Sequence, residues 1–240
     1  MARVLAVVVA RGGSLGVPRK NLQKIAGKTL VEHSVAHALN SESVDRVILS
    51  TDSREIAEIG AKAGAEVPFL RPAELALPET LDQPVFEHAI NFIEKLDGYV
   101  PDAVVHLRPT APYRKCGWID SAVRMFLDNK ECDSVRSVSL ADMHPYRMFD
   151  IDKSSGFLKP IMGHRHSEPY TLRRQDLPEI YFYNCVIDVT SPGTIRGKKS
   201  MTGDNILPFI IPPDLALDID TPADLNYVRY LVENHIEIDH

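Results

Sequence analysis

The chain has 240 residues, of which 44% are hydrophobic and 25% are charged, a composition typical of a globular protein with its own core. Its three cysteines (Cys116, Cys132 and Cys185) form no Cys-x-x-Cys pair. This pattern argues against a disulfide framework and against a four-ligand zinc site, and it favours a reducing compartment. The net charge of −6 argues against broad nucleic-acid binding, which depends on neutralising many phosphates.

The longest apolar run, Val4–Ala10, is far too short to span a bilayer. It leads directly into a glycine-rich basic turn without a signal-peptide cleavage pattern, so we interpret it as a buried strand and expect a cytoplasmic protein. Strand-like and helix-like segments then alternate along the chain. We predict strands at 4–10, 44–49, 103–107, 134–138 and 180–189, and helices at 30–39, 56–63, 85–96, 118–127 and 222–232.

This alternation predicts an α/β fold with a three-layer, Rossmann-like arrangement around a mostly parallel sheet. Ligands of such sheets bind beyond the carboxyl ends of the strands. The chemically interesting residues follow Ala10, follow Leu107 and lie near Leu217. The sequence therefore predicts one site at this edge of the sheet.

The alternation stops near residue 140. Residues 141–180 are rich in His, Pro, Arg, Tyr and Met and show no regular period. We interpret them as an inserted arm that covers the active site or joins two subunits, with a disordered loop as the alternative. Residues 1–140 and 181–240 would then form the main domain.

The first turn carries an unusual concentration of positive charge. Residues 1–31 contain no acidic residue but contain Arg3, Arg11, Arg19, Lys20, Lys24 and Lys28. A solvated basic face is one interpretation. An anion site is the other, because glycines at 12, 13 and 16 allow backbone N–H groups to converge on an anion. The spacing matches neither a dinucleotide fingerprint nor a P-loop, and three basic residues in one loop suit a nucleoside triphosphate.

Residues 10–21 read Ala-Arg-Gly-Gly-Ser-Leu-Gly-Val-Pro-Arg-Lys-Asn, which resembles the signature of the acylneuraminate (CMP-sialic acid) cytidylyltransferase family. Further matches follow in order at 69–75, 107–114, 173–178 and 218–224. The resemblance implies a nucleotidyltransferase-type fold and a homodimer whose arms exchange. It also implies in-line attack of a 2-keto sugar acid on the α-phosphate of CTP, which releases pyrophosphate.

The resemblance assigns roles around the nucleotide. Arg11 and Lys20 would clamp the triphosphate, while Asn21 and Arg71 would contact the nucleotide. Arg71 and the backbone from Thr80 to Gln83 would recognise the base; without its motif, Arg71 would equally suit a surface salt bridge. The remaining nucleotide-binding candidates in the loop are Ala10, Gly12, Gly13, Ser14 and Arg19.

Asp218 and Asp220 form an Asp-x-Asp pair that we place at a strand end, with both side chains on one side. A divalent cation relieves the repulsion of paired carboxylates, and Mg²⁺ takes one or two carboxylates together with phosphate oxygens. We therefore predict Mg²⁺ as the cofactor and count both aspartates, with Arg11 and Lys20, as catalytic. The alternative is helix capping, because Asp220 and Thr221 precede Pro222.

The sugar acid carries a carboxylate, so its pocket requires a cation. Arg108, Arg173 and Arg174 are the candidates, although the last two also suit salt bridges between arm and subunit. Lys159 and Arg165 would reach a partner's site. The other expected contacts are Thr110, Gln175, Tyr183 and Asn184.

Two positions depart from the family pattern. Leu15 replaces a lysine of the phosphate loop, and Arg19 is the nearest candidate to compensate for it. Arg108 stands where sialic-acid-specific members tend to have glutamine, so legionaminic and pseudaminic acids are expected as much as N-acetylneuraminic acid. Two alternatives stay open: a nucleotidyltransferase for another base or acceptor, and a non-catalytic nucleotide-sugar-binding protein.

Overall fold

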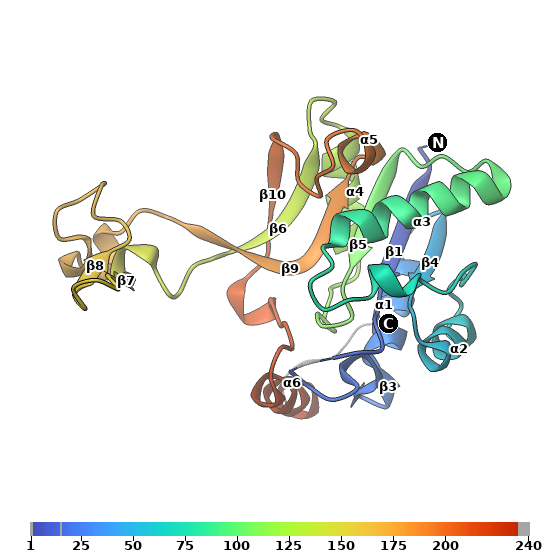
Figure 1. The fold of residues 1–240 in the computed structure, drawn as a ribbon, viewed down its shortest axis with the longest axis horizontal. Helices are drawn as coiled ribbons and strands as arrows, with labels where there is room; N and C mark the ends of the chain where they lie inside the picture. The colour runs from blue at the N-terminus through green and yellow to red at the C-terminus, as the bar shows by residue number, and fades with distance from the viewer. Residues whose placement is uncertain (1, 15, 235–240) are drawn as a thin grey trace.

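A computed structural model describes residues 2–14 and 16–234, in which a six-stranded sheet has the order β10-β6-β9-β5-β1-β4 (Figure 1). All of these strands run parallel except β9, which is antiparallel to both β5 and β6. The α/β class and the mostly parallel sheet are confirmed. The strands are β1 Val4–Val9, β4 Arg46–Ser50, β5 Ala103–Leu107, β6 Ser134–Leu140, β9 Tyr181–Thr190 and β10 Ile206–Ile210.

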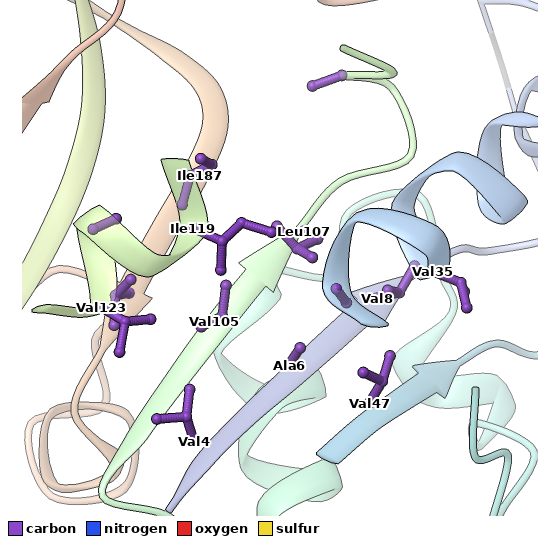
Figure 2. Close-up of a cluster of buried hydrophobic side chains, with 14 of the residues drawn as sticks. Val4, Ala6, Val8, Val35, Val47, Val105, Leu107, Ile119, Val123 and Ile187 are labelled. Atoms are coloured by element: carbon purple, nitrogen blue, oxygen red, sulfur yellow. The ribbon is translucent and has the colours of Figure 1, made fainter. Parts of the chain in front are cut away.

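Helices cover both faces of the sheet and give it three layers. Side chains of β1 alternate between the two faces of the sheet. Val4, Ala6 and Val8 pack on one face, as Figure 2 shows, while Leu5 and Val7 pack on the other. The first face is covered by α1 Leu30–Leu39, α2 Arg54–Lys62 and α4 Trp118–Leu127, and the second by α3 Asp82–Asp97 and α5 Pro192–Arg196. A smaller cluster packs α6 Pro222–Asn234 beside the first turn.

The local sequence fixes several helix ends. Thr29 and Glu32 form a capping box that begins α1 at the predicted residue. α3 begins three residues before the prediction, because Pro84 lies within its first turn, where the missing N–H costs no helical hydrogen bond. None of the helices in the described ranges is both long and apolar enough to cross a bilayer.

The segment between β6 and β9 projects from the sheet as an arm (Figure 1). It contains a small hairpin of β7 Phe149–Ile151 and β8 Leu158–Pro160 and the 3-10 helices η3 Pro145–Arg147, η4 Pro169–Thr171 and η5 Arg174–Asp176. Its hairpin side chains are exposed, including Ile151, Phe157 and Leu158. The arm therefore presents apolar groups to its surroundings.

Some elements had no counterpart in the sequence analysis. β10 was missed, as were the two-residue strands β2 Lys24–Ile25 and β3 Lys28–Thr29, the short helix α5, and the 3-10 helices η1 Lys20–Leu22, η2 Ala73–Leu75 and η6 Pro213–Leu215. β10 is a half-exposed edge strand with Pro208 at its centre, and proline is tolerated in a sheet mainly at an edge.

Candidate active site

A cleft of about 450 Å³ opens at the carboxyl ends of β1 and β5. It is lined by the turn after β1, the segment from Arg71 to Val85, the turn after β5 and the residue Asp220. The predicted site residues that line it are Arg11, Ser14, Lys20, Asn21, Arg71, Thr80, Arg108, Thr110 and Asp220. Residues 200 positions apart in the chain thus meet at the expected edge of the sheet.

Lys20 joins the amino-terminal turn to the acidic segment. Its Nζ donates to the backbone carbonyl of Ile219 at 2.9 Å and lies 3.0 Å from Oδ1 of Asp220. The lysine side chain is 16% exposed, whereas that of Asp220 is 74% exposed. The ammonium group is thereby held in a fixed position at the cleft wall, facing the space where an anion would enter.

Gly16 makes this approach of the two segments possible. A Cβ added at Gly16 would lie 2.3 Å from the carbonyl oxygen of Asp220, closer than real Cβ atoms come to backbone. Only glycine therefore allows the turn to pack on the acidic segment.

Gly16→Ala should accordingly displace Asp220 from Lys20. We expect the Kd for the nucleoside triphosphate that the sequence predicts as ligand to rise about tenfold, with an overpacking cost of about 1–3 kcal/mol in the free energy of unfolding. Calorimetric titration and urea unfolding measure the two effects. Gly193→Ala in α5 is the matched control, because its Cβ would make only an ordinary contact, 3.6 Å from Ser191 Oγ, and Gly193 is not among the described residues that line the cleft; equal losses in both variants would contradict the packing argument.

The segment that carries Asp218 and Asp220 is not a strand end, and that prediction was wrong. It is an extended loop ahead of α6, held to the turn after β5 by the hydrogen bond from Ile219 N to Thr110 O at 2.9 Å. Of the two capping candidates, Thr221 caps α6: its Oγ1 accepts from the N–H of Asp224 at 3.3 Å, and its own N–H donates to the Asp224 carboxylate at 2.7 Å. The side chain of Asp220 does not take part in this cap and contacts Lys20 instead.

Asp218 combines burial with an unused oxygen. Its Oδ1 is buried and finds no hydrogen-bond partner among the described residues. Burial raises the pKa of Asp218, the hydrogen bond from Thr110 lowers it, and the charge of Asp220 raises it further. Within residues 2–14 and 16–234 no group of three or more His, Cys, Asp or Glu side chains is arranged around a metal. Two carboxylates fit Mg²⁺ that completes its shell with phosphate oxygens and water.

Three further polar residues of the cleft are held by hydrogen bonds to backbone carbonyls or to a serine hydroxyl. Asn21 donates to the carbonyl of Arg11 at 2.8 Å, and Arg11 donates to the carbonyl of Leu77 at 3.3 Å. Arg71 is 7% exposed and its Nε donates to Ser50 Oγ at 3.0 Å. Burial lowers the pKa of Arg71. Arg71 is therefore a fixed, partly desolvated cation and not the surface ion pair considered as its alternative.

The other candidates of the phosphate loop lie in different surroundings, and one of them is not at the cleft. Ala10 continues the pairing with β4 through a 3.1 Å hydrogen bond to Ser50, and the N–H of Gly12 donates to Asp52 at 2.8 Å. Arg19 pairs with Glu55 of α2, and it is absent from the described residues that line the cleft. Leu15, for which Arg19 was considered a substitute, lies outside the described residues.

Gln83 also turns away from the cleft, because its amide donates to Ile195 O at 2.9 Å and to Glu87 at 2.8 Å. Its neighbour Thr80 lines the cleft and donates to the carbonyl of Glu74 at 3.3 Å. The segment before α3, and not the side chain of Gln83, therefore lines this side of the cleft.

Arg108 lies at the centre of a charged network. Its Nη1 donates to Asp188 at 2.7 Å and its Nη2 to Asp82 at 2.9 Å. Asp188 is fully buried on β9, where Arg136 also donates to it at 2.8 Å and Tyr183 binds it through its hydroxyl. These carboxylates raise the pKa of Arg108 against the opposing effect of burial. The guanidinium group is thus already paired on two sides.

His106 lies behind this network, 1% exposed, with its Nδ1 3.9 Å from Asp82 and 3.8 Å from Asp188. Neither ring nitrogen has a hydrogen-bond partner among the described residues. Burial, followed by the positive charges of Arg108 and Arg136, lowers the pKa of His106 well below its ordinary value. The imidazole is therefore neutral in the folded protein.

This burial predicts acid sensitivity of the fold. As pH falls below about 6.5 the unfolded chain protonates this histidine while the folded chain does not, so the unfolding free energy falls by up to about 1.4 kcal/mol per pH unit. Urea unfolding at pH 7.5, 6.5 and 5.5 measures the slope. His106→Gln should reduce it, whereas His164→Gln at an exposed position of the arm should not. An unchanged slope in His106→Gln would contradict the assignment.

Arg114 supports the turn after β5 from beneath. It is 1% exposed and donates to the carbonyls of Arg108 at 2.9 Å, Ala111 at 2.7 Å and Val186 at 2.8 Å. Burial and the charge of Arg108 lower the pKa of Arg114 to about 9. This guanidinium group therefore holds in place the turn that carries Arg108 and Thr110.

The remaining sugar-binding candidates lie elsewhere. Arg173 pairs with Asp176, Arg174 pairs with Asp142, and Gln175 is exposed, all within the arm. Asn184 is 4% exposed and its amide donates to Ser139 at 2.8 Å. It forms part of a bulge of β9 opposite β6 and is not among the described residues that line the cleft, so its contact with the sugar stays a prediction. Tyr183 remains half-exposed beside Arg108.

Four network residues were not identified from the sequence: Asp82, Asp188, Arg136 and His106. For His106 a local signal existed, because it is a titratable residue within the apolar run 103–107. The others pair across long sequence separations and carry no local signature.

The sequence and the fold are similar to those of known cytidylyltransferases. The family model described as Cytidylyltransferase matches residues 5–141. The CMP-N,N'-diacetyllegionaminic acid synthase of Legionella pneumophila is 33% identical, with 96% of this chain and 97% of that protein covered. The pseudaminic acid cytidylyltransferase of Campylobacter jejuni is 29% identical over the same shares. The solved structure of a CMP:2-keto-3-deoxy-manno-octonic acid synthetase complexed with CTP has a TM-score of 0.71 at 15% identity, covering 98% of this chain and 100% of that chain.

Proposed function

Because the chain belongs to the cytidylyltransferase family, we propose that it is an enzyme that joins CTP to a nonulosonic acid, a 2-keto sugar acid, and releases pyrophosphate. The observation that carries the proposal is the meeting of Lys20 with Asp220 at the cleft, beside Arg11 and Arg71. A cation that faces a polyphosphate, next to carboxylates that suit Mg²⁺, is the arrangement that nucleotidyl transfer requires. A protein that only binds a nucleotide sugar has no need of paired carboxylates for a metal, so the Asp218–Asp220 pair favours an enzyme.

The residues divide the chemistry between them. The anomeric hydroxyl oxygen forms a bond to the α-phosphorus, the bond from that phosphorus to the bridging oxygen breaks, and the hydroxyl proton leaves to solvent. Lys20 and Arg11 hold the triphosphate and offset charge on the pyrophosphate that departs. Asp218 and Asp220 would hold Mg²⁺, which when bound polarises the α-phosphate and lowers the pKa of the attacking hydroxyl.

A panel of substrates tests the proposal. CTP with Mg²⁺ and N,N'-diacetyllegionaminic, pseudaminic, N-acetylneuraminic or 2-keto-3-deoxy-manno-octonic acid should release pyrophosphate with at least one acid. GTP, UTP and ATP should not replace CTP. Turnover with another nucleotide would instead support a nucleotidyltransferase of different base specificity. No turnover with any pair would refute the enzyme.

We also propose a homodimer formed through the arms, in the cytoplasm. The support is the exposed apolar hairpin of the arm and the projection of the arm away from the central sheet (Figure 1). Lys159 and Arg165 lie on this arm. A partner's arm would bring such cations to a cleft whose own arginine at 108 is already paired. Light scattering should give twice the chain mass, and Phe157→Asp with Leu158→Asp should give the monomer; a monomeric wild-type protein would refute the dimer.

A further inference from the structure

A second cavity, of about 260 Å³, lies outside the cleft, between the end of α1 and the start of α4. Its wall includes Arg114, Lys115, Cys116 and Asp120, and none of these is among the described residues that line the cleft. The volume is several times the ~30 Å³ that one water molecule occupies in the liquid. This α1–α4 cavity therefore has room for a small ligand.

Arg114 brings a buried cation without a counter-ion to this cavity. It is 1% exposed and forms no ion pair with any described carboxylate. Its hydrogen bonds go to three backbone carbonyls and, at 3.4 Å, to Ser34 Oγ and His37 Nδ1, none of which is an anion. Burial and the charge of Arg108 lower its pKa to about 9, and more distant carboxylates offset this only in part. An anion in the cavity would supply the opposite charge that this buried guanidinium group lacks.

The wall of the cavity adds a second cation and the start of a helix. Lys115 is exposed, and its ammonium group forms no hydrogen bond or ion pair with a described residue. The N-cap of α4 is Gly117, which has no side chain to cap the helix, and the N–H groups of Ile119 and Asp120 have no acceptor among the described residues. Such unsatisfied N–H groups at a helix start favour an anion.

Asp120 is the one carboxylate among the described residues of the wall. Its Oδ1 accepts from Ser41 Oγ at 2.6 Å and from the N–H of Ser43 at 2.8 Å, so its charge is already engaged by protein donors. The end of α1 is also closed, because Asn40 and Ser41 donate their N–H groups to carbonyls of its last turn. Two cations against one engaged carboxylate leave the wall with a positive balance.

We propose that the α1–α4 cavity is a binding site for a phosphate group, with Arg114 and Lys115 as its cations and the first N–H groups of α4 as further donors. A phosphate presents oxygens in several directions and suits donors that converge from a guanidinium group, an ammonium group and a helix start. Its source is inorganic phosphate, pyrophosphate or a small sugar phosphate, which share this chemistry. Because Arg114 also donates to the carbonyls of Arg108 and Ala111, the occupant contacts the residue that holds the turn after β5. The site is separate from the proposed function and does not depend on it.

Cys116 reports whether the cavity is filled, because its thiol lies on the wall and is exposed, whereas Cys132 and Cys185 are half-buried. Alkylation of Cys116 by iodoacetamide is followed by mass spectrometry of its peptide, with inorganic phosphate, pyrophosphate or glucose 6-phosphate added. The rate should fall about fivefold at a ligand concentration of about four times Kd, since only the empty form reacts. The three half-saturating concentrations identify the preferred source. Sodium chloride at the same ionic strength should have little effect, and protection should persist in Lys20→Met, whose cleft lacks its ammonium group.

Lys115→Met should raise the half-saturating concentration about tenfold, because it removes one charged donor. The half-saturating concentration is compared, and not the rate itself, because Lys115 adjoins the reporting thiol. Lys130→Met is the matched control, since Lys130 is an exposed lysine beyond the other end of α4 and is not among the described residues of the cavity wall. No protection by any of the three compounds, equal shifts in the two lysine variants, or protection by sodium chloride would overturn the inference. Loss of protection in Lys20→Met would place the anion in the cleft instead. None of these measurements uses turnover, so failure of the proposed function is a separate result.

Discussion

Lys20→Met should lower kcat/KM for CTP by about 10²–10³-fold, the loss typical of one preorganised charge-stabilising donor. The methionine side chain is unbranched like the apolar stem of lysine but has no ammonium group, so it cannot donate to Asp220 or to the carbonyl of Ile219. Because Lys20 is held in position before any ligand enters, the enzyme does not have to reorganise it during the reaction. Steady-state pyrophosphate release at varied CTP measures the effect.

Lys24→Met is the matched control for this variant. Lys24 belongs to the same basic amino-terminal stretch but is exposed on β2 and does not line the cleft among the described residues. Its removal should change kcat/KM less than about twofold. If both variants lost activity equally, the basic stretch would act through its overall field and not through one positioned ammonium group. A loss under about tenfold in Lys20→Met alone would refute the clamp.

The elements predicted with matching bounds are those whose ends carry their own signals. α1 begins after the capping residue Thr29, and the fully buried β5 is an apolar run interrupted only by His106. The order of the strands had no such signal. β9 enters the sheet antiparallel between β5 and β6, and its bulge at Asn184 is stabilised by Ser137 and Ser139 of the neighbouring strand. Such pairings depend on contacts between distant segments, which periodicity does not report.

The site shows the same division. The turn after β1 and the Asp218–Asp220 segment were recognised because each concentrates its charges within a few residues. The sequence did not predict which of the charged side chains near the site are paired with other protein residues. Arg108 meets partners 26 and 80 residues away, and Arg19 meets Glu55 of α2. A sequence identifies which cations lie near a site, whereas the fold decides which of them remain available to a substrate.

The paired carboxylates lead to the other large expected effect. Asp218→Asn and Asp220→Asn should each reduce kcat by about 10³-fold, since loss of a metal that polarises the phosphate removes several kcal/mol of transition-state stabilisation. Asp214→Asn is the control, because Asp214 is an exposed residue on η6, shortly before the same segment. It should retain activity.

Binding measurements separate a lost metal from a lost fold and an enzyme from a binding protein. Calorimetric titration of Mn²⁺ in the presence of a non-hydrolysable CTP analogue should show one fewer or a much weaker metal site in Asp218→Asn, whose unpartnered Oδ1 is the oxygen best placed to ligate. Thermal unfolding should change little, because an amide in place of a desolvated carboxylate relieves its repulsion with Asp220. Full retention of nucleotide affinity together with full retention of turnover would show that the aspartates do not serve a metal. Retained nucleotide affinity in a wild-type protein without any turnover would instead identify a binding protein that keeps the fold of the family.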